Sequence, residues 1–166
     1  MNNLEQKKAA FADLIEIIET LREKCPWDKK QTLESLRSLT IEEVYELGDA
    51  ILAKDMQEVK KELGDLIMHL VFYARLAEEQ GEFDMAGVLT AICDKLRYRH
   101  PHIYGDIQVE DEQDVLRNWE QLKLKEKGRK HKVLEGVPVS LPALVKAYRI
   151  QDKVCLLYTS PSPRDA

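Results

Sequence analysis

The sequence predicts an all-α fold, an antiparallel bundle of helices, on the basis of three observations. Apolar residues recur at intervals of three and four positions in several segments, as they do on one face of a helix. Residues that favour helix N-termini precede these segments, and Gly or Pro follows several of them. No segment shows the apolar–polar alternation of a strand, and a chain of 166 residues with only 7 Gly and 6 Pro has few of the turns that a β fold needs.

The first predicted helix precedes the segment CPWD, residues 25–28. Its apolar stripe recurs at steps of three and four residues and consists of Phe11, Leu14, Ile18 and Leu21. Pro26 disfavours helical geometry in the residue before it, so this helix is expected to end ahead of CPWD.

A capping signal predicts the start of the second helix. Thr40 is followed three residues later by Glu43, which is the pattern of a capping box, where each side chain binds the backbone N–H of the other residue. From this start the helix is predicted to run to about Ala53.

Similar signals delimit the third and fourth helices. Asp55 with Glu58 predicts the start of the third helix, and Gly81 is expected to end it. Asp84 is expected to cap a fourth helix, which runs toward RYRHPH and is interrupted there by Pro101. A fifth helix is predicted over about residues 112–127, with one face formed by Val115, Trp119 and Leu122.

One domain is predicted for residues 1–153, followed by an unrelated or disordered tail at 154–166. A helical stretch, PALVKAYRIQDKV, gives way from Cys155 onward to the Ser- and Pro-rich segment CLLYTSPSPRDA. A natural disordered terminus and a peptide translated from a sequencing adaptor both explain this change of composition. We assign the tail no function.

The composition limits which binding partners and which cellular location we expect for this protein. The net charge of -5 argues against nucleic acid as a partner. No apolar run approaches the roughly 18 residues of a membrane span, and the N-terminal segment MNNLEQKKAAF lacks the core of a signal peptide. An odd number of widely separated cysteines argues against a disulfide framework or a thiolate zinc site: Cys25, Cys93 and Cys155. We therefore expect a cytoplasmic protein with no nucleic-acid or membrane partner.

Two pairs of acidic residues lie beside the apolar stripes of the second and third helices. Positions three apart on a helix differ by roughly 60° and rise about 4.5 Å, so Glu43 and Glu46 project from one side of the second helix. Glu62 and Asp65 do the same on the third. If the two apolar stripes pack together, both pairs converge at the rim of one interface. The apolar residues that flank the pairs are Leu47, Ile51, Val59 and Leu66.

Four converging carboxylates predict a divalent cation, because they repel one another without one and their hard oxygens select Mg²⁺, or Mn²⁺ as a substitute. Spacing alone leaves the alternative of solvated helix flanks open, and His69 is either a fifth ligand or a surface or packed histidine. A di-iron site is disfavoured because it requires Glu-x-x-His, and Asp65 stands at the position of that histidine.

Basic and aromatic residues downstream suit a polyphosphate. Lys95 and Arg99 lie four apart at the end of the fourth helix, and Trp119 and Lys123 lie four apart on the fifth. Cations would neutralise phosphate oxygens and the indole would pack on a base or sugar. The alternative is that Lys95 and Arg99 compensate the dipole at a helix C-terminus while Trp119 fills the core.

Five blocks in this order resemble the MazG family of nucleoside triphosphate pyrophosphohydrolases: CPWDKKQTLESL, EEVYE, ELGDLIMHLVFYA, DKLRYRHPHIYGD and NWEQLK. The resemblance covers about residues 4–153. The motif E-x-x-E followed by E-x-x-D is short and unspecific by itself, whereas the five blocks together are specific.

The resemblance implies a bundle of the all-α NTP pyrophosphatase type, usually dimeric, that uses Mg²⁺ to hydrolyse NTPs or dNTPs to the monophosphate and pyrophosphate through water attack at the α-phosphorus. Four residues match the family's catalytic metal ligands: Glu43, Glu46, Glu62 and Asp65. Five further residues match positions at the substrate. Lys61 matches a position that borders the nucleotide, and Lys95 and Arg99 match the pair that contacts the phosphates. Trp119 and Lys123 match positions beside the nucleotide.

The CPWD block is similar to the first of two tandem domains in long MazG proteins, in which a second copy follows shortly after SLPAL. The sequence departs from that pattern after RIQDKV, so we expect a truncated fragment with the first domain only. An alternative function is therefore a weakly active module that serves dimerisation or regulation of a tandem protein. A purely structural helical bundle is a third alternative.

Overall fold

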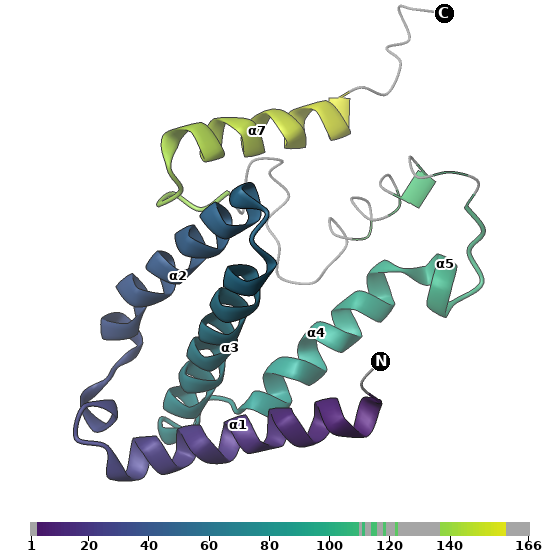
Figure 1. Ribbon diagram of the computed structural model, residues 1–166. Helices are drawn as coiled ribbons and strands as arrows, with labels where there is room; N and C mark the ends of the chain where they lie inside the picture. The colour runs from purple at the N-terminus through teal and green to yellow at the C-terminus, as the bar shows by residue number, and fades with distance from the viewer. Residues whose placement is uncertain are drawn as a thin grey trace, which may run out of the picture. The chain divides into compact units, whose positions relative to one another are not determined.

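The computed structural model describes residues 3–109, 111, 114, 115, 118, 122 and 137–158, and of residues 152, 153 and 155–158 it describes the backbone alone (Figure 1). Every regular element among these residues is a helix, so the predicted all-α class is confirmed. The chain divides into two compact units, residues 1–92 and 93–166, which are described separately.

The first unit begins with α1 (Leu4–Lys24) and the short 3₁₀ helix η1 (Asp28–Lys30). Asn3 caps α1 in a capping box with Gln6, and the helix ends at Cys25, ahead of CPWD as predicted. The guanidinium of Arg22 binds the loop that follows, donating to the backbone carbonyls of Asp28 and Gln31.

Helix α2 (Leu33–Ala53) begins earlier than predicted. Thr32 and Ser35 form its capping box, so the prediction of a box at Thr40 and Glu43 is wrong. Thr40 lies inside the helix, where its hydroxyl bonds to the carbonyl of Leu36 at 3.0 Å. The same Thr-x-x-polar pattern occurs at both positions, and the first one along the chain starts the helix.

Helix α3 (Met56–Glu79) starts where its capping signal predicts. The carboxylate of Asp55 accepts hydrogen bonds from the backbone N–H groups of Gln57 and Glu58. After the helix ends, Gly81 adopts a left-handed φ of 71°, a conformation that side chains disfavour. The predicted ends of α3 are therefore confirmed.

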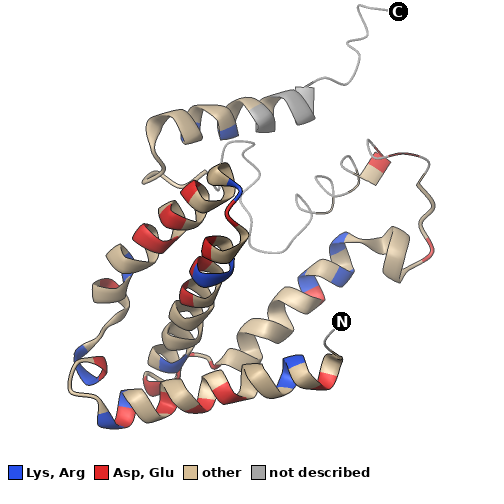
Figure 2. Ribbon diagram, viewed as in Figure 1, with Lys and Arg blue, Asp and Glu red and all other residues tan. Residues whose placement is uncertain are grey.

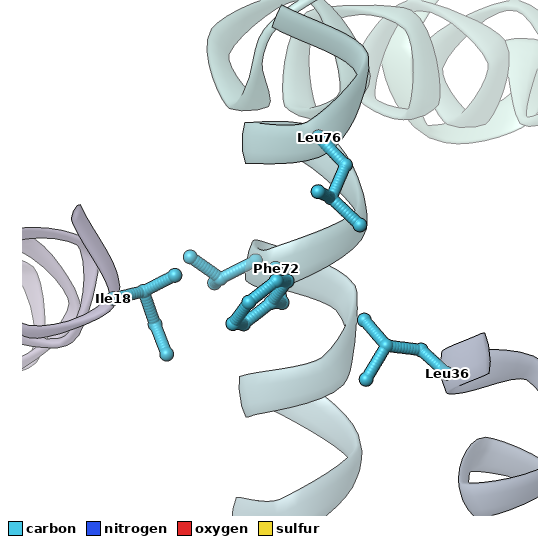
Figure 3. Close-up of a cluster of buried hydrophobic side chains, with 5 residues drawn as sticks. Ile18, Leu36, Phe72 and Leu76 are labelled. Atoms are coloured by element: carbon cyan, nitrogen blue, oxygen red, sulfur yellow. The ribbon is translucent and has the colours of Figure 1, made fainter. Parts of the chain in front are cut away.

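A small apolar core joins three helices of the first unit. It consists of Ile18 from α1, Leu36 from α2, and Val71, Phe72 and Leu76 from α3. Figure 3 shows Phe72 between Ile18 and Leu36. Helix α3 contacts both other helices, and its contact with α2 is the more extensive. Burial of these side chains holds the α2–α3 hairpin together.

Helix α4 (Met85–Arg99) starts in the first unit and ends in the second. Asp84 accepts a hydrogen bond of 2.7 Å from the backbone N–H of Gly87, which confirms the predicted cap. The helix ends at Arg99, and α5 (Pro101–Tyr104) begins with the proline that was predicted to interrupt it.

The second unit also contains α7 (Ala143–Tyr158). This helix continues past Cys155, so the change of composition there does not end it, and the boundary between 153 and 154 stays a prediction. Most of the helix predicted over 112–127 lies outside the described residues, including Trp119 and Lys123. Within the described part of the chain, no helix combines the length and apolarity needed to cross a membrane.

Candidate metal centre

The α2–α3 hairpin brings predicted acidic residues from both helices together. Ligand oxygens of Glu43, Glu62 and Asp65 all lie within 4.8 Å of one another, close enough to share one ion. Glu43 comes from α2, and the other two come from one side of α3, three positions apart. Figure 2 shows acidic residues on both helices toward the end of the hairpin where a short turn joins them.

Glu62 is the most buried member of this group, with 2% of its surface exposed. Its Oε1 accepts a hydrogen bond of 2.9 Å from the ammonium group of Lys61. Its Oε2 is buried and has no hydrogen-bond partner. A desolvated carboxylate oxygen without a partner is unfavourable, so this atom fits a bound cation.

The charges of the group act on one another. The bond from Lys61 is the main reason why the pKa of Glu62 lies below its ordinary value, and the neighbouring carboxyl groups of Glu43 and Glu46 act in the same direction. The pKa of Glu43 is raised, mainly by burial, then by the neighbouring carboxyl group of Glu62 and by the charges of Asp65 and Glu46. A cation among these oxygens would remove both the repulsion and the affinity for a proton.

Glu46, the fourth predicted ligand, lies at the edge of the group. Its side chain is exposed and its oxygens are not among those within 4.8 Å. Its carboxyl group nevertheless contributes to lowering the pKa of Glu62 and to raising the pKa of Glu43. The structure therefore gathers three of the four predicted acids and leaves the fourth beside them.

His69 is packed in the interior and does not belong to the group of ligand atoms found among the described residues. It is 4% exposed, its Nδ1 has no hydrogen-bond partner, and burial lowers its pKa against the opposing charge of Asp65. Of the two interpretations of this residue, the structure favours the packed histidine.

The predicted substrate residues are only partly described. Lys61 lies at the acidic group, bonded to Glu62 and, at 3.3 Å, to Glu58. Lys95 and Arg99 lie on α4 within the second unit, Lys95 exposed and Arg99 half-buried. Trp119 and Lys123 lie outside the described residues.

One contact near the acidic group was not predicted. The hydroxyl of Thr40, one turn before Glu43, lies 2.7 Å from the hydroxyl of Tyr73 on α3. The sequence signal was a threonine within the apolar stripe of a helix, which we interpreted as a cap. Its pairing with a tyrosine 33 positions away follows only from the packing of the hairpin.

Known proteins are similar to this chain in sequence and in fold. Residues 31–104 match the model of the MazG nucleotide pyrophosphohydrolase domain. The chain is 44% identical over 145 residues to a protein of Escherichia coli K12 named nucleoside triphosphate pyrophosphohydrolase, an alignment that covers 84% of this chain and 55% of that protein. It is 42% identical over 145 residues to the nucleoside triphosphate pyrophosphohydrolase/pyrophosphatase MazG of Thermotoga maritima, covering 86% of this chain and 55% of that protein.

A solved structure extends the comparison to the fold. The crystal structure of a mazG-related protein from Thermotoga maritima superimposes with a TM-score of 0.61 at 26% identity, covering 69% of this chain and 99% of that one. The chain spans about half the length of the first two of these relatives, 55% in each case. The domain match, the identity to these relatives and the common helical fold show that this chain contains a domain of the MazG family at residues 31–104.

Proposed function

We propose that this protein hydrolyses nucleoside triphosphates, NTPs or dNTPs, to the monophosphate and pyrophosphate in the cytoplasm, with Mg²⁺ as cofactor and Mn²⁺ as a substitute. The observation that carries the proposal is the acidic group inside the MazG domain, where three carboxylates from two helices lie within 4.8 Å and include a buried oxygen without a partner. The names of its relatives supply the substrate class.

Four carboxylates would hold the metal in this proposal: Glu43, Glu46, Glu62 and Asp65. When bound, Mg²⁺ would neutralise the triphosphate and lower the pKa of a coordinated water. In the reaction a bond forms between the water oxygen and the α-phosphorus, and the bond from that phosphorus to the bridging oxygen breaks as pyrophosphate leaves. The acids themselves repel phosphate, so they cannot bind the substrate directly.

Positive side chains would complete the substrate site. Lys95 and Arg99 would donate to phosphate oxygens as negative charge develops on them. Trp119 would stack on the base or sugar, and Lys123 would lie beside the nucleotide. Lys61 would border the nucleotide, a position consistent with its ammonium group lying 2.9 Å from Glu62.

We also propose that the domain spans residues 1–153 and that residues 154–166 form an unrelated or disordered tail.

We further propose that the protein forms a homodimer or higher homo-oligomer. Apolar side chains at helical spacing on α3 support association, because Leu63, Ile67 and Leu70 are 41–56% exposed. These exposed residues also support a second candidate function, a weakly active module for dimerisation or regulation.

Pyrophosphate release tests the proposed activity. The wild type is incubated with mixed dNTPs and Mg²⁺, and in parallel with EDTA in excess. Release that stops in EDTA supports the hydrolase. If Mg²⁺ and nucleotide raise the melting temperature without any release of pyrophosphate, the module is the correct function and the hydrolase is wrong.

A further inference from the structure

The contact between Thr40 and Tyr73 joins α2 to α3 close to the acidic group. Thr40 lies three positions before Glu43, which corresponds to about 4.5 Å along the helix. Tyr73 lies eight positions after Asp65, with the buried His69 midway between them. Because the hairpin is antiparallel, Thr40 and Tyr73 lie on the same side of the acids, toward the apolar core.

The direction of each hydrogen bond follows from the number of protons. Thr40 has one hydroxyl proton, and the carbonyl of Leu36 at 3.0 Å can only accept it. The Thr40 oxygen is then the acceptor for the Tyr73 hydroxyl at 2.7 Å, so Tyr73 donates. Tyr73 therefore donates to Thr40, and Thr40 donates to the carbonyl of Leu36. These two half-buried hydrogen bonds connect a side chain of α3 to the backbone of α2.

This bond resists a force that the apolar core does not resist. Mutual repulsion among Glu43, Glu62 and Asp65 pushes the two helices apart at the acidic end of the hairpin. Apolar contacts such as that of Leu36 with Phe72 are non-directional and permit sliding of one helix along the other. A hydrogen bond one turn from Glu43 fixes both the separation and the relative height of the helices.

We propose that Thr40 and Tyr73 are positioning residues that set the spacing of the carboxylates for the divalent metal. The inference rests on the proposed function of the acidic group. Neither residue touches the metal or the substrate; both act through the placement of Glu43 relative to Glu62 and Asp65. Loss of the bond widens the spacing and weakens metal binding, while the apolar core keeps the helices folded.

Mn²⁺ affinity tests the inference, measured by electron paramagnetic resonance of the free ion with no nucleotide present. Tyr73→Phe and Thr40→Val each remove the bond, whereas Thr40→Ser keeps the hydroxyl. We expect both removals to weaken Mn²⁺ binding by about three- to tenfold, which corresponds to roughly 0.6–1.4 kcal/mol and lies within the range for one net hydrogen bond. Thr40→Ser is expected to bind within about twofold of the wild type.

A double-mutant cycle separates positioning from general loosening of the fold. Because one bond is lost in each case, Thr40→Val/Tyr73→Phe is expected to bind Mn²⁺ no more weakly than either single variant. Tyr104→Phe, an exposed tyrosine on α5, is the control and should bind as the wild type does. Circular dichroism in EDTA checks that each variant is folded. If Tyr73→Phe does not fold, the comparison of Thr40→Val with Thr40→Ser carries the test.

The outcomes distinguish this inference from the function on which it rests. Wild-type protein that binds no Mn²⁺ would overturn the proposed metal centre itself. Normal wild-type binding with unchanged affinity in Tyr73→Phe and Thr40→Val would overturn the positioning role alone. Additive losses in the double variant, equal losses in Thr40→Val and Thr40→Ser, or unfolding of both removal variants would also overturn it, since each indicates a structural effect.

Discussion

The two oxygens of Glu62 have different environments. Oε1 is bonded to Lys61, whereas Oε2 is buried and has no hydrogen-bond partner. Spacing along α3 predicts that Glu62 and Asp65 share a side of the helix, but it predicts neither the burial of Glu62 nor the orphaned oxygen. That atom is the strongest argument at the residue scale for a cation.

Asp65→Asn is expected to abolish pyrophosphate release, by about a hundredfold or more, while the protein remains folded. Removing one negative charge lowers the repulsion in the metal-free group, so the melting temperature in EDTA should stay the same or rise slightly. Glu16→Gln, an exposed acid on α1, is the matched control and should retain full activity. Turnover of Asp65→Asn near the wild-type rate would contradict the assignment of the ligands.

Lys61→Met is expected to change metal and substrate binding in opposite directions. The ammonium group of Lys61 competes with a divalent ion for Glu62, so its removal should strengthen Mn²⁺ binding severalfold in the absence of nucleotide. The same charge would attract the triphosphate, so KM for dNTPs should rise. Lys60→Met, the exposed neighbouring lysine, is the control. An unchanged or lower KM would show that Lys61 has no role at the nucleotide, and weaker Mn²⁺ binding would contradict its competition with the ion.

At the scale of elements, Arg22 connects three segments. Its guanidinium donates to both carboxylate oxygens of Glu79 on α3, at 2.9 and 2.8 Å, as well as to carbonyls of the loop around η1. A two-pronged contact of this kind fixes direction as well as distance. It holds the CPWD segment between α1 and α2 against the end of α3.

Glu79→Gln is expected to lower the free energy of unfolding by about 1–3 kcal/mol at pH 7, because a charged hydrogen bond is lost. The bond from Arg22 lowers the pKa of Glu79 in the folded protein. The contribution of Glu79 to stability is therefore complete above the pKa of the unfolded chain and is lost as the pH falls through the folded pKa.

Urea denaturation of wild type and Glu79→Gln across this acidic range tests the linkage. The difference in unfolding free energy should be largest at neutral pH and should shrink as the medium becomes more acidic. Glu78→Gln is the control, since among the described residues the carboxylate of Glu78 contacts only the guanidinium of Arg75, at a longer distance of 3.7 Å. A difference that stays constant with pH would contradict the role of the Arg22–Glu79 pair.

The helix boundaries show which local sequence signals are sufficient to predict where a helix begins. Asp55 and Asp84 cap α3 and α4 as predicted, because each carboxylate binds backbone N–H groups within three residues and needs no other part of the protein. Thr40 resembled a cap by the same criterion. Its hydroxyl instead bonds within α2 and to Tyr73, a partner that the sequence places 33 positions away.

At the scale of the whole molecule, the exposed apolar stripe of α3 has the character of an interface. Leu63→Glu combined with Ile67→Glu is expected to convert a dimer or higher oligomer to a monomer in size-exclusion chromatography with light scattering. A charge in such a stripe opposes burial against another copy. Ile17→Glu on the exposed face of α1 serves as the control and should leave the oligomer intact. A monomeric wild type would contradict the proposed association.

The sequence by itself determined the helical class, the end of α1, both ends of α3, the cap of α4, and the acids and cations that the MazG resemblance requires. These features depend on residues within a turn or two of one another, whose geometry a helix fixes wherever it lies. Only the tertiary structure decided that Glu43, Glu62 and Asp65 share one space, that Glu46 stands beside them, and that Thr40 pairs with Tyr73. Those relations depend on the distance and register between two helices, which are set by packing across the hairpin and not by any local pattern.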